Sequence, residues 1–157
     1  MIRVIAIGKM KDKALRMLED EYVRRLTPFH KTEIIEVRDE PASRGDREKD
    51  NELARIREGE RALDKIREDD FVILLDLHGK EWDSETFAKN LGRWQERARC
   101  LTFVIAGSTG PSKALVSRAD ERWKLSSLTF THLMTRVLLL EQVYRASMIL
   151  NNRTYHK

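Results

Sequence analysis

The stretch Phe103-Val-Ile-Ala-Gly-Ser-Thr-Gly110 begins as an apolar run, typical of a buried strand, and breaks into a short loop with two glycines. A second stretch, Leu125-Ser-Ser-Leu-Thr-Phe130, places small and apolar residues where a polar surface turn would be ordinary. Loops of small residues leave their backbone N–H and C=O groups accessible to a ligand. The two stretches therefore predict a pocket that is lined largely by backbone.

Strand patterns and helical patterns alternate on either side of these loops. Strand patterns cover residues 3–7, 32–37, 71–75, 101–106 and 122–125, and helical patterns cover 12–26, 46–67, 84–97, a short segment after 112, and 132–150. This alternation predicts an α/β fold with a mostly parallel sheet and helices on both faces, in a single domain spanning residues 1–157. Ligands of such sheets bind beyond the C-terminal ends of the strands, so the ends at Leu75, Ala106 and Leu125 are expected to face one crevice.

The helical patterns also predict buried faces and helix boundaries. The second helix carries four apolar side chains at helical spacing, which are expected to face inward while its mixed charges form a solvated face: Leu53, Ile56, Leu63 and Ile66. Ser84 is the expected N-cap of the third helix, and its expected inward residues are Phe87, Leu91 and Trp94. Residues 41–45 are expected to form a loop.

The last helical pattern is apolar around more than one face. Its apolar residues are Leu133, Met134, Val137, Leu138, Leu139, Leu140, Val143, Tyr144, Met148, Ile149 and Leu150. A surface helix of an α/β domain needs one apolar stripe. The second apolar side predicts a subunit interface, and therefore a homodimer; the alternative is that this helix is the central one of the fold.

Composition narrows the setting of the protein. The net charge is +4, and residues 107–157 carry eight basic against three acidic side chains, so positive charge collects in the same third as the two loops. This distribution favours a polyanionic partner. Cys100 is the one cysteine, which excludes an internal disulfide and favours the reducing cytoplasm. There is no signal-peptide pattern at the N-terminus and no apolar run of the roughly 20 residues that span a membrane, so no membrane role is expected.

Several common chemistries lack their motifs. No Gly-x-Gly-x-x-Gly follows the first strand pattern, and Gly107-Ser-Thr-Gly-Pro-Ser-Lys113 does not have the spacing of a phosphate-binding P-loop. No Cys/His cluster has metal-ligand spacing, so no metal is expected, and no nucleophile elbow occurs. A pocket of backbone groups and apolar side chains suits an adenosine-containing ligand.

Motifs along nearly the whole chain carry a resemblance whose specificity lies in their order and spacing. They are Ile5-Ala-Ile-Gly8-Lys9, Glu21-Tyr22 with Arg25, Ile34-Ile-Glu-Val37, Leu75-Asp-Leu-His-Gly79-Lys80, Phe103-Val-Ile-Ala-Gly107, Arg118-Ala-Asp120, Leu125-Ser-Ser-Leu-Thr-Phe130-Thr-His132, Arg136-Val-Leu-Leu-Leu-Glu141-Gln-Val-Tyr144-Arg145-Ala146 and Tyr155-His156-Lys157. The chain resembles the SPOUT-class methyltransferases, specifically the ribosomal RNA large subunit methyltransferase H family. It departs from the family pattern at Ala106, where glycine is usual, and at Thr131, where proline is frequent.

The resemblance implies a C-terminal trefoil knot, S-adenosylmethionine as methyl donor and an obligate homodimer. It assigns the donor site to Leu75, Ala106, Gly107, Leu125, Ser126, Ser127, Leu128, Thr129 and Phe130. The implied acceptor is N3 of a pseudouridine in 23S ribosomal RNA, within the large subunit or the 70S ribosome. The chain has no appended RNA-binding domain, so recognition of an assembled particle is expected.

N3 of a pseudouridine carries a proton that must leave before the nitrogen can attack. Candidate bases are His156 and His132, and candidate charge stabilisers are Arg136, Arg145 and Arg153. Tyr155 is expected to stack on the target base, and the tail residue Lys157 to contact RNA.

Other interpretations of these residues and of the function stay open. His132 could cap the last helix or form a hydrogen bond within the knot, Arg145 could pair with Glu141 one turn earlier, and residues 155–157 could be a frayed end. The alternative functions are a SPOUT methyltransferase for another ribosomal or transfer RNA nucleotide, and a non-catalytic ribosome-binding dimer of the same fold.

Overall fold

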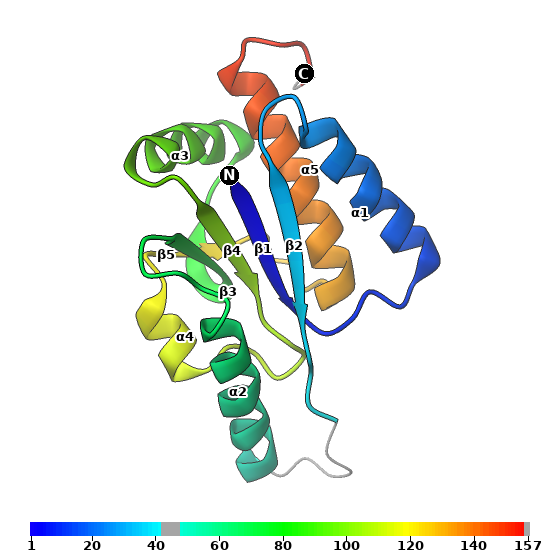
Figure 1. Ribbon diagram of the computed structural model, residues 1–157, viewed down its shortest axis with the longest axis vertical. Coiled ribbons are helices and arrows are strands. Elements are labelled where there is room, and N and C mark those ends of the chain that lie inside the picture. The colour runs from blue at the N-terminus through cyan, green and yellow to red at the C-terminus, as the bar shows by residue number, and fades with distance from the viewer. Residues whose placement is uncertain (42–47, 156–157) are drawn as a thin grey trace.

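Five parallel strands form one sheet at the centre of the molecule (Figure 1). The computed structural model describes residues 1–41 and 48–155. The strand order is β2-β1-β4-β3-β5, and the strands are β1 (Ile2–Ile7), β2 (Thr32–Val37), β3 (Phe71–Glu81), β4 (Leu101–Ile105) and β5 (Glu121–Lys124). The predicted α/β fold with a parallel sheet is confirmed. Most of the loop expected at residues 41–45 lies outside the described residues.

Helices cover both faces of the sheet, as predicted. They are α1 (Lys13–Leu26), α2 (Glu48–Leu63), α3 (Ser84–Arg97), α4 (Lys113–Arg118) and α5 (His132–Leu150). Because successive strand residues point to opposite faces, Ile2 and Val4 pack on the face of α1, α3 and α5, whereas Ile5 and Ile7 pack on the face of α2 and α4 (Figure 1). The sheet therefore separates two apolar cores. Within the described ranges, no helix is long and apolar enough to cross a membrane.

Two sequence predictions about the helices were wrong in detail. The N-cap of α3 is Asp83, whose carboxylate accepts a hydrogen bond from the Thr86 N–H at 2.7 Å, and not Ser84. On α2, the exposed fractions of Leu53 and Ile56 are 45% and 41%, while the buried residues are Glu58, Gly59 and Ala62. The second half of α2 is the part that packs on the sheet and on α4, so the apolar residues of the first half stay in solvent.

The strand β3 continues beyond its apolar run. It was expected to end at Leu75 but extends to Glu81, with a register shift against β5 between Leu75 and Lys80. Gly79 lies directly against this neighbour, since a Cβ at this position would be 2.5 Å from the Arg122 carbonyl oxygen. Glycine is therefore the residue that permits the close pairing of β3 with β5.

Helix α5 is buried on two sides because it packs against both α1 and α3. Leu139, Leu140 and Val143 are fully buried at its centre. The central position of the helix, which was the alternative interpretation, accounts for most of its apolar surface. Met134 and Leu150 are 38% and 40% exposed, and the homodimer stays a prediction.

Candidate functional site

The three strand ends expected to line the donor site lie side by side. In the register of the sheet, Leu75 of β3 is paired with Ile105 of β4 on one side and with Trp123 of β5 on the other. Ala106 follows the first partner directly, and Leu125 follows β5. The C-terminal edge of the sheet thus brings together segments that are up to fifty residues apart in the chain, and we call it the donor edge.

The loop after β4 is a tight turn with two different requirements for glycine. The Gly107 carbonyl accepts a hydrogen bond from the Gly110 N–H at 3.1 Å, and Gly110 has a φ of +87°, which favours glycine. Gly107 is needed for close packing instead. A Cβ there would lie 2.7 Å from Glu58 Oε2 and 3.1 Å from the Ile7 Cγ2 atom.

The segment 125–130 is anchored near its start and exposed near its end. Leu125 packs against the core, and the Ser127 hydroxyl donates to Glu81 Oε2 at 3.0 Å and lies 2.9 Å from Lys124 Nζ. Leu128 is 70% exposed and Phe130 38% exposed. Ser126 is half-buried and Thr129 is exposed. Apolar side chains that stand in solvent beside an anchored loop are available for contact with a ligand.

An ion pair that the sequence analysis did not single out ties β3 to β5 beside Leu75. Arg122 Nε donates to Asp76 Oδ2 at 2.8 Å, and the other oxygen of this carboxylate accepts the His78 N–H at 3.0 Å. Asp76 is 7% exposed. It belongs to the quoted motif Leu75-Asp-Leu-His-Gly79-Lys80, so position within a motif was the signal that could have identified it.

His132 lies at the start of α5 beside the end of β1. It is not the helix cap, because the N-cap is Thr131, whose side chain accepts the Met134 N–H at 3.3 Å. A Cβ on Gly8, which has a φ of +96°, would be 3.3 Å from His132 Nε2 and 3.9 Å from the Asp39 carboxyl carbon. The imidazole is thus held near the donor edge.

Arg136 is buried in an ion-pair network and faces away from solvent. Its guanidinium, 1% exposed, pairs with Glu19 at 2.7 Å and with Glu36 at 2.9 Å, and the Glu19 side chain is fully buried. Burial disfavours the charged form of Glu36, yet hydrogen bonds from the Met10 N–H, Arg136 and Arg16 outweigh it and lower its pKa. These contacts favour a structural role for Arg136 over the expected catalytic one.

The C-terminal tail is docked on α5 as far as the structure describes it. The ring of Tyr155 packs edge-on against Tyr144 with 4.9 Å between centroids, and the Arg145 guanidinium lies 4.7 Å from the Tyr155 centroid. Arg145 also pairs with Glu141 at 2.5 Å, which confirms the alternative interpretation of this arginine. Burial, together with a hydrogen bond to Tyr22, raises the pKa of Tyr155 to about 12.

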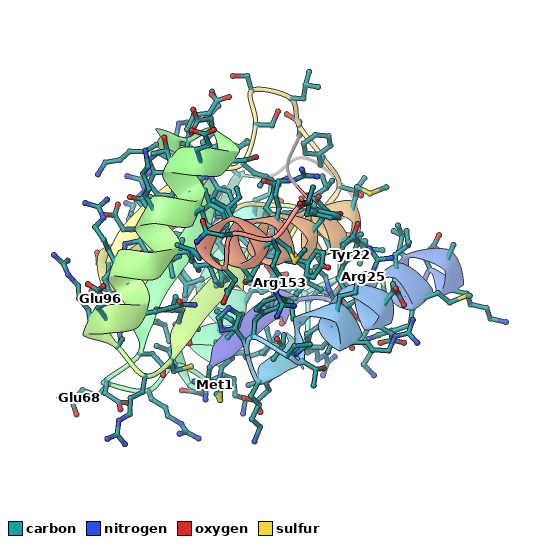
Figure 2. All side chains as sticks on the ribbon, turned by 90° about the horizontal axis from the view of Figure 1, so that it is seen from above. Met1, Tyr22, Arg25, Glu68, Glu96 and Arg153 are labelled. Carbon is teal, nitrogen blue, oxygen red and sulfur yellow. The ribbon has the colours of Figure 1, made fainter. Side chains whose placement is uncertain are left out.

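Arg153, which precedes Tyr155 in the tail, packs on the segment after α1. The Arg153 guanidinium lies 5.2 Å from the Phe29 ring centroid. Seen from above in Figure 2, Arg153 lies near Tyr22 and Arg25 of α1. The two other predicted tail residues, His156 and Lys157, lie outside the described residues.

The predicted site residues therefore fall into two groups that lie apart along α5. His132 begins this helix at the donor edge, whereas the Tyr155 ring packs on Tyr144 and its hydroxyl donates to Glu141 Oε1 at 3.4 Å, so the tail folds back along the second half of the helix. With a rise of about 1.5 Å per residue, the twelve residues from His132 to Tyr144 separate the two groups by roughly 18 Å. A single chain thus does not bring the donor edge and the tail together.

Comparison with known proteins gives the family. A family model described as "Predicted SPOUT methyltransferase" matches residues 1–156. The chain belongs to the SPOUT methyltransferase family. The expectation of a methyltransferase is confirmed at this level, and the segments that meet at the donor edge are those for which the family resemblance predicted methyl-donor contacts.

Curated relatives match this SPOUT methyltransferase from end to end. Ribosomal RNA large subunit methyltransferase H 1 of Clostridium perfringens (strain SM101) is 43% identical over 157 residues, with 99% of each chain covered. Ribosomal RNA large subunit methyltransferase H of Clostridioides difficile (strain 630) is 41% identical with the same coverage. The suspected family relationship is therefore confirmed.

A solved structure shares the fold. A probable methylase family protein from Haemophilus influenzae Rd KW20 superposes with a TM-score of 0.52 at 14% identity, covering 96% of this chain and 66% of that chain. At this identity the likeness concerns the fold alone. The trefoil knot stays a prediction from the resemblance.

Two further features of this SPOUT methyltransferase bear on its chemistry. A surface hollow of about 420 Å³ lies between α3 and the end of α5, with Glu85, Lys89 and Arg153 in its lining, and it is away from the donor edge. Burial raises the pKa of the Cys100 thiol, which keeps it protonated and poorly nucleophilic. Within the described part of the chain, no group of three or more His, Cys, Asp or Glu residues is arranged to hold a metal ion.

Proposed function

We propose that this protein transfers the methyl group of S-adenosylmethionine to N3 of a pseudouridine in 23S ribosomal RNA. The observation that carries the proposal is the end-to-end match, at 43% identity, to a relative named ribosomal RNA large subunit methyltransferase H 1. The match covers the donor edge, the segment 125–130 and the tail. The proposal extends the activity named for this relative to the present chain. It adds S-adenosylmethionine as the methyl donor, a pseudouridine as the acceptor base and N3 as the methylated atom.

The residues at the donor edge fit a methyl donor of this kind. Leu75 and Leu125 offer apolar contact for an adenine ring, and the turn from Gly107 to Gly110 offers backbone polar groups at the end of β4. Buried oxygen atoms beside this turn, on Glu58 and Thr109, have no hydrogen-bond partner within the described residues, and they suit a polar ligand or a loop rearranged by one. When bound, S-adenosylmethionine supplies a methyl group on a positively charged sulfur, and the protein has to align it and exclude water.

The acceptor nitrogen has to lose its proton, and the chain offers histidines for this step. An imidazole is the side chain best suited to accept a proton at neutral pH. His132 is at the donor edge, so we assign it as the first candidate base, with His156 of the tail as the second. The raised pKa of Tyr155 keeps its hydroxyl protonated, so Tyr155 is proposed to stack on the target base and not to act as a base.

We infer that the working site combines two subunits. Tyr155 is docked on Tyr144 of α5, roughly 18 Å along the helix from His132 at the donor edge, so one chain cannot apply both to the same nucleotide without undocking the tail. A homodimer in which the tail of one subunit reaches the donor edge of the other meets this requirement. Arg145, Arg153, Lys157 and the rest of the tail would then contact the RNA backbone beside the target base.

The proposal is tested by offering the protein four acceptors with labelled S-adenosylmethionine: ribosomes, large subunits, free 23S RNA and transfer RNA. Ribosomes and large subunits from a strain without this enzyme should accept methyl groups, whereas free 23S RNA should accept few, because a net charge of +4 provides only weak attraction to naked RNA. Efficient methylation of transfer RNA would favour the alternative SPOUT substrate. Donor binding without transfer to any RNA would favour a non-catalytic ribosome-binding dimer.

A further inference from the structure

Glu58 is a buried carboxylate with one oxygen satisfied and the other not. The side chain lies on α2 and the residue is 4% exposed. Its Oε1 accepts the Glu40 backbone N–H at 2.8 Å, whereas Oε2 is buried without a hydrogen-bond partner within the described residues. Oε2 faces the loop after β4, because a Cβ on Gly107 would lie 2.7 Å from it. A buried acceptor without a donor costs free energy and calls for an explanation.

The same loop carries a buried donor without a partner. The Thr109 hydroxyl has no hydrogen-bond partner in the part of the chain that the structure describes. Its residue is already held against α2, because Arg55 Nη1 donates to the Thr109 carbonyl at 3.2 Å. Arg55 and Glu58 are three residues apart and so lie on one face of the helix. An unpartnered hydroxyl and an unpartnered carboxylate oxygen thus occupy the same interface.

Helix α2 also packs closely against α4, beside this loop. Gly59 packs against Ser112, the N-cap of α4, so closely that a Cβ would lie 2.2 Å from its hydroxyl oxygen. Ser112 in turn accepts the Leu115 N–H at 3.2 Å. The helix therefore packs through Gly59 against Ser112, which follows the loop, while Arg55 and Glu58 contact the loop itself.

We propose that Glu58 is a positioning residue that sets the 107–110 loop for the methyl donor: its Oε2 accepts a hydrogen bond from the Thr109 hydroxyl when the donor binds. The inference rests on the proposed function, since it takes S-adenosylmethionine as the ligand of this loop. In the free protein the two groups are buried apart, and donor binding joins them. Part of the binding free energy then comes from the interface of α2 with the loop.

The proposal has a consequence for pH. Burial raises the pKa of Glu58, against a hydrogen bond from the Glu40 N–H; the charges of Asp39 and Glu40 raise it further, and Arg61 opposes them. Arg57 pairs with Glu40 at 3.3 Å, and residues 106–112 of the loop carry no charge. A hydrogen bond to the charged form lowers the pKa in the donor-bound state. Binding therefore releases a proton between the two pKa values, and donor affinity falls as the pH drops below the pKa of the free state.

The test is isothermal calorimetry with S-adenosylmethionine over a range of pH and in buffers of different ionisation enthalpy. Glu58→Gln keeps an oxygen for the Glu40 N–H but puts an amide where an anionic acceptor is needed, so donor affinity should fall about tenfold at neutral pH. The donor affinity of this variant should not depend on pH as that of the parent does, and its donor binding should release no proton. Glu60→Gln is the matched control, because Glu60 is on the same helix and exposed, and it should behave as the parent does.

Thr109→Val removes the partner hydroxyl with little change in volume and serves as the second variant. It should weaken donor binding to a similar extent, and the double variant should be no weaker than either single one, because both remove the same bond. The melting temperature of the free Glu58→Gln protein should equal or exceed that of the parent, since a buried unpartnered charge is removed. If Glu58 had only a structural role, Glu58→Gln would lower the melting temperature and leave the donor affinity and its pH profile unchanged. That result would overturn this inference but not the proposed function. Absence of donor binding by the parent itself would overturn the proposed function as well.

Discussion

Arg136 shows how burial decides the role of a charged residue. The sequence offers it as a charge stabiliser in catalysis, and the structure places it between two carboxylates, Glu19 and Glu36. A guanidinium in that position links α5 to α1 and β2. Its loss leaves the fully buried Glu19 with the partly exposed Arg16 as its ion-pair partner among the described residues, and removal of one member of a buried pair is more costly than loss of the pair.

Replacing Arg136 with Met should therefore lower the free energy of unfolding by about 3–5 kcal/mol, measured by urea denaturation. The control is Arg24→Met, which removes an exposed partner of Glu21 and should cost about 1 kcal/mol or less. If the Arg136 variant kept the stability of the parent and lost methyl transfer alone, the catalytic interpretation would be the better one.

Tyr155 provides a test of the docked tail through its ionisation. Because burial and the hydrogen bond with Tyr22 raise its pKa to about 12, its contribution to stability is present below about pH 10, the ordinary pKa of tyrosine, and is lost as the pH rises toward 12. Titration of phenolate absorbance should show one tyrosine that ionises late, and Tyr155→Phe should remove that transition. Absence of a late transition that Tyr155→Phe removes would mean that the tail is not docked.

The roles of individual residues at the site were predicted least well from the sequence. The sequence shows two glycines in the loop after β4 but not their different roles, since Gly110 has a positive φ whereas Gly107 is glycine because Glu58 lies against it. Glu58 itself stands in a mixed charge run that was interpreted as a solvated face. Burial of a charged side chain depends on which half of a helix meets the sheet, and a sequence pattern does not contain that information.

At the scale of elements, the pairing of β3 with β5 positions the candidate donor loop. The close contact of Gly79 with the Arg122 backbone and the ion pair of Asp76 with Arg122 hold the two strands together. The segment 125–130 follows β5 directly and is tied back to Glu81 of β3 through Ser127. Disturbance of this pairing should therefore reach the donor site.

Gly79→Ala should lower the free energy of unfolding by about 2–3 kcal/mol and weaken donor binding, because its Cβ would overlap the Arg122 carbonyl. Gly92→Ala in α3 is the control. Its Cβ would meet the flexible Leu150 side chain at 3.2 Å, and alanine favours a helix, so stability should stay within about 1 kcal/mol of the parent. Equal behaviour of the two variants in denaturation and calorimetry would contradict the role of the β3–β5 pairing.

Most elements could be predicted from periodicity, because buried strands and amphipathic helices leave clear patterns. The bounds of β2 and α5 match the predicted ones, and α4 begins after its cap Ser112. The extension of β3 beyond Leu75 could not be predicted, since residues 76–81 are mostly polar and lack a buried-strand pattern, and Lys80 and Glu81 pair with β5, which lies beside them. The exposure of Leu53 and Ile56 was missed for the same reason, as it depends on tertiary packing.

At the scale of the whole molecule, the two groups of candidate site residues lie apart along α5, with His132 at its start and Tyr155 docked on Tyr144. If both act on one nucleotide, the functional unit is a dimer with shared sites. This proposal predicts complementation between two inactive chains: one that lacks residues 155–157, and one in which Gly107 is replaced by Trp to block the donor loop.

Mixed and reassociated, these chains should recover about a quarter of the parent activity, since half of the dimers are mixed and each mixed dimer has one intact donor edge facing one intact tail. Calorimetry should show that the truncated chain alone still binds S-adenosylmethionine. No recovery on mixing would mean that each tail serves its own subunit or none, and full activity of the truncated chain would remove the tail from the site.

The central claim is the methylation of one base in 23S ribosomal RNA, and nucleoside mass spectrometry tests it most directly. Ribosomes from a strain without the enzyme are incubated with this protein and S-adenosylmethionine, and the 23S RNA is digested and analysed. The account predicts one new nucleoside, a pseudouridine that is heavier by one methyl group at N3, located at a single position. A methyl group on another base or on transfer RNA, or ribosomal RNA that stays unmodified while the protein binds the donor, would contradict it.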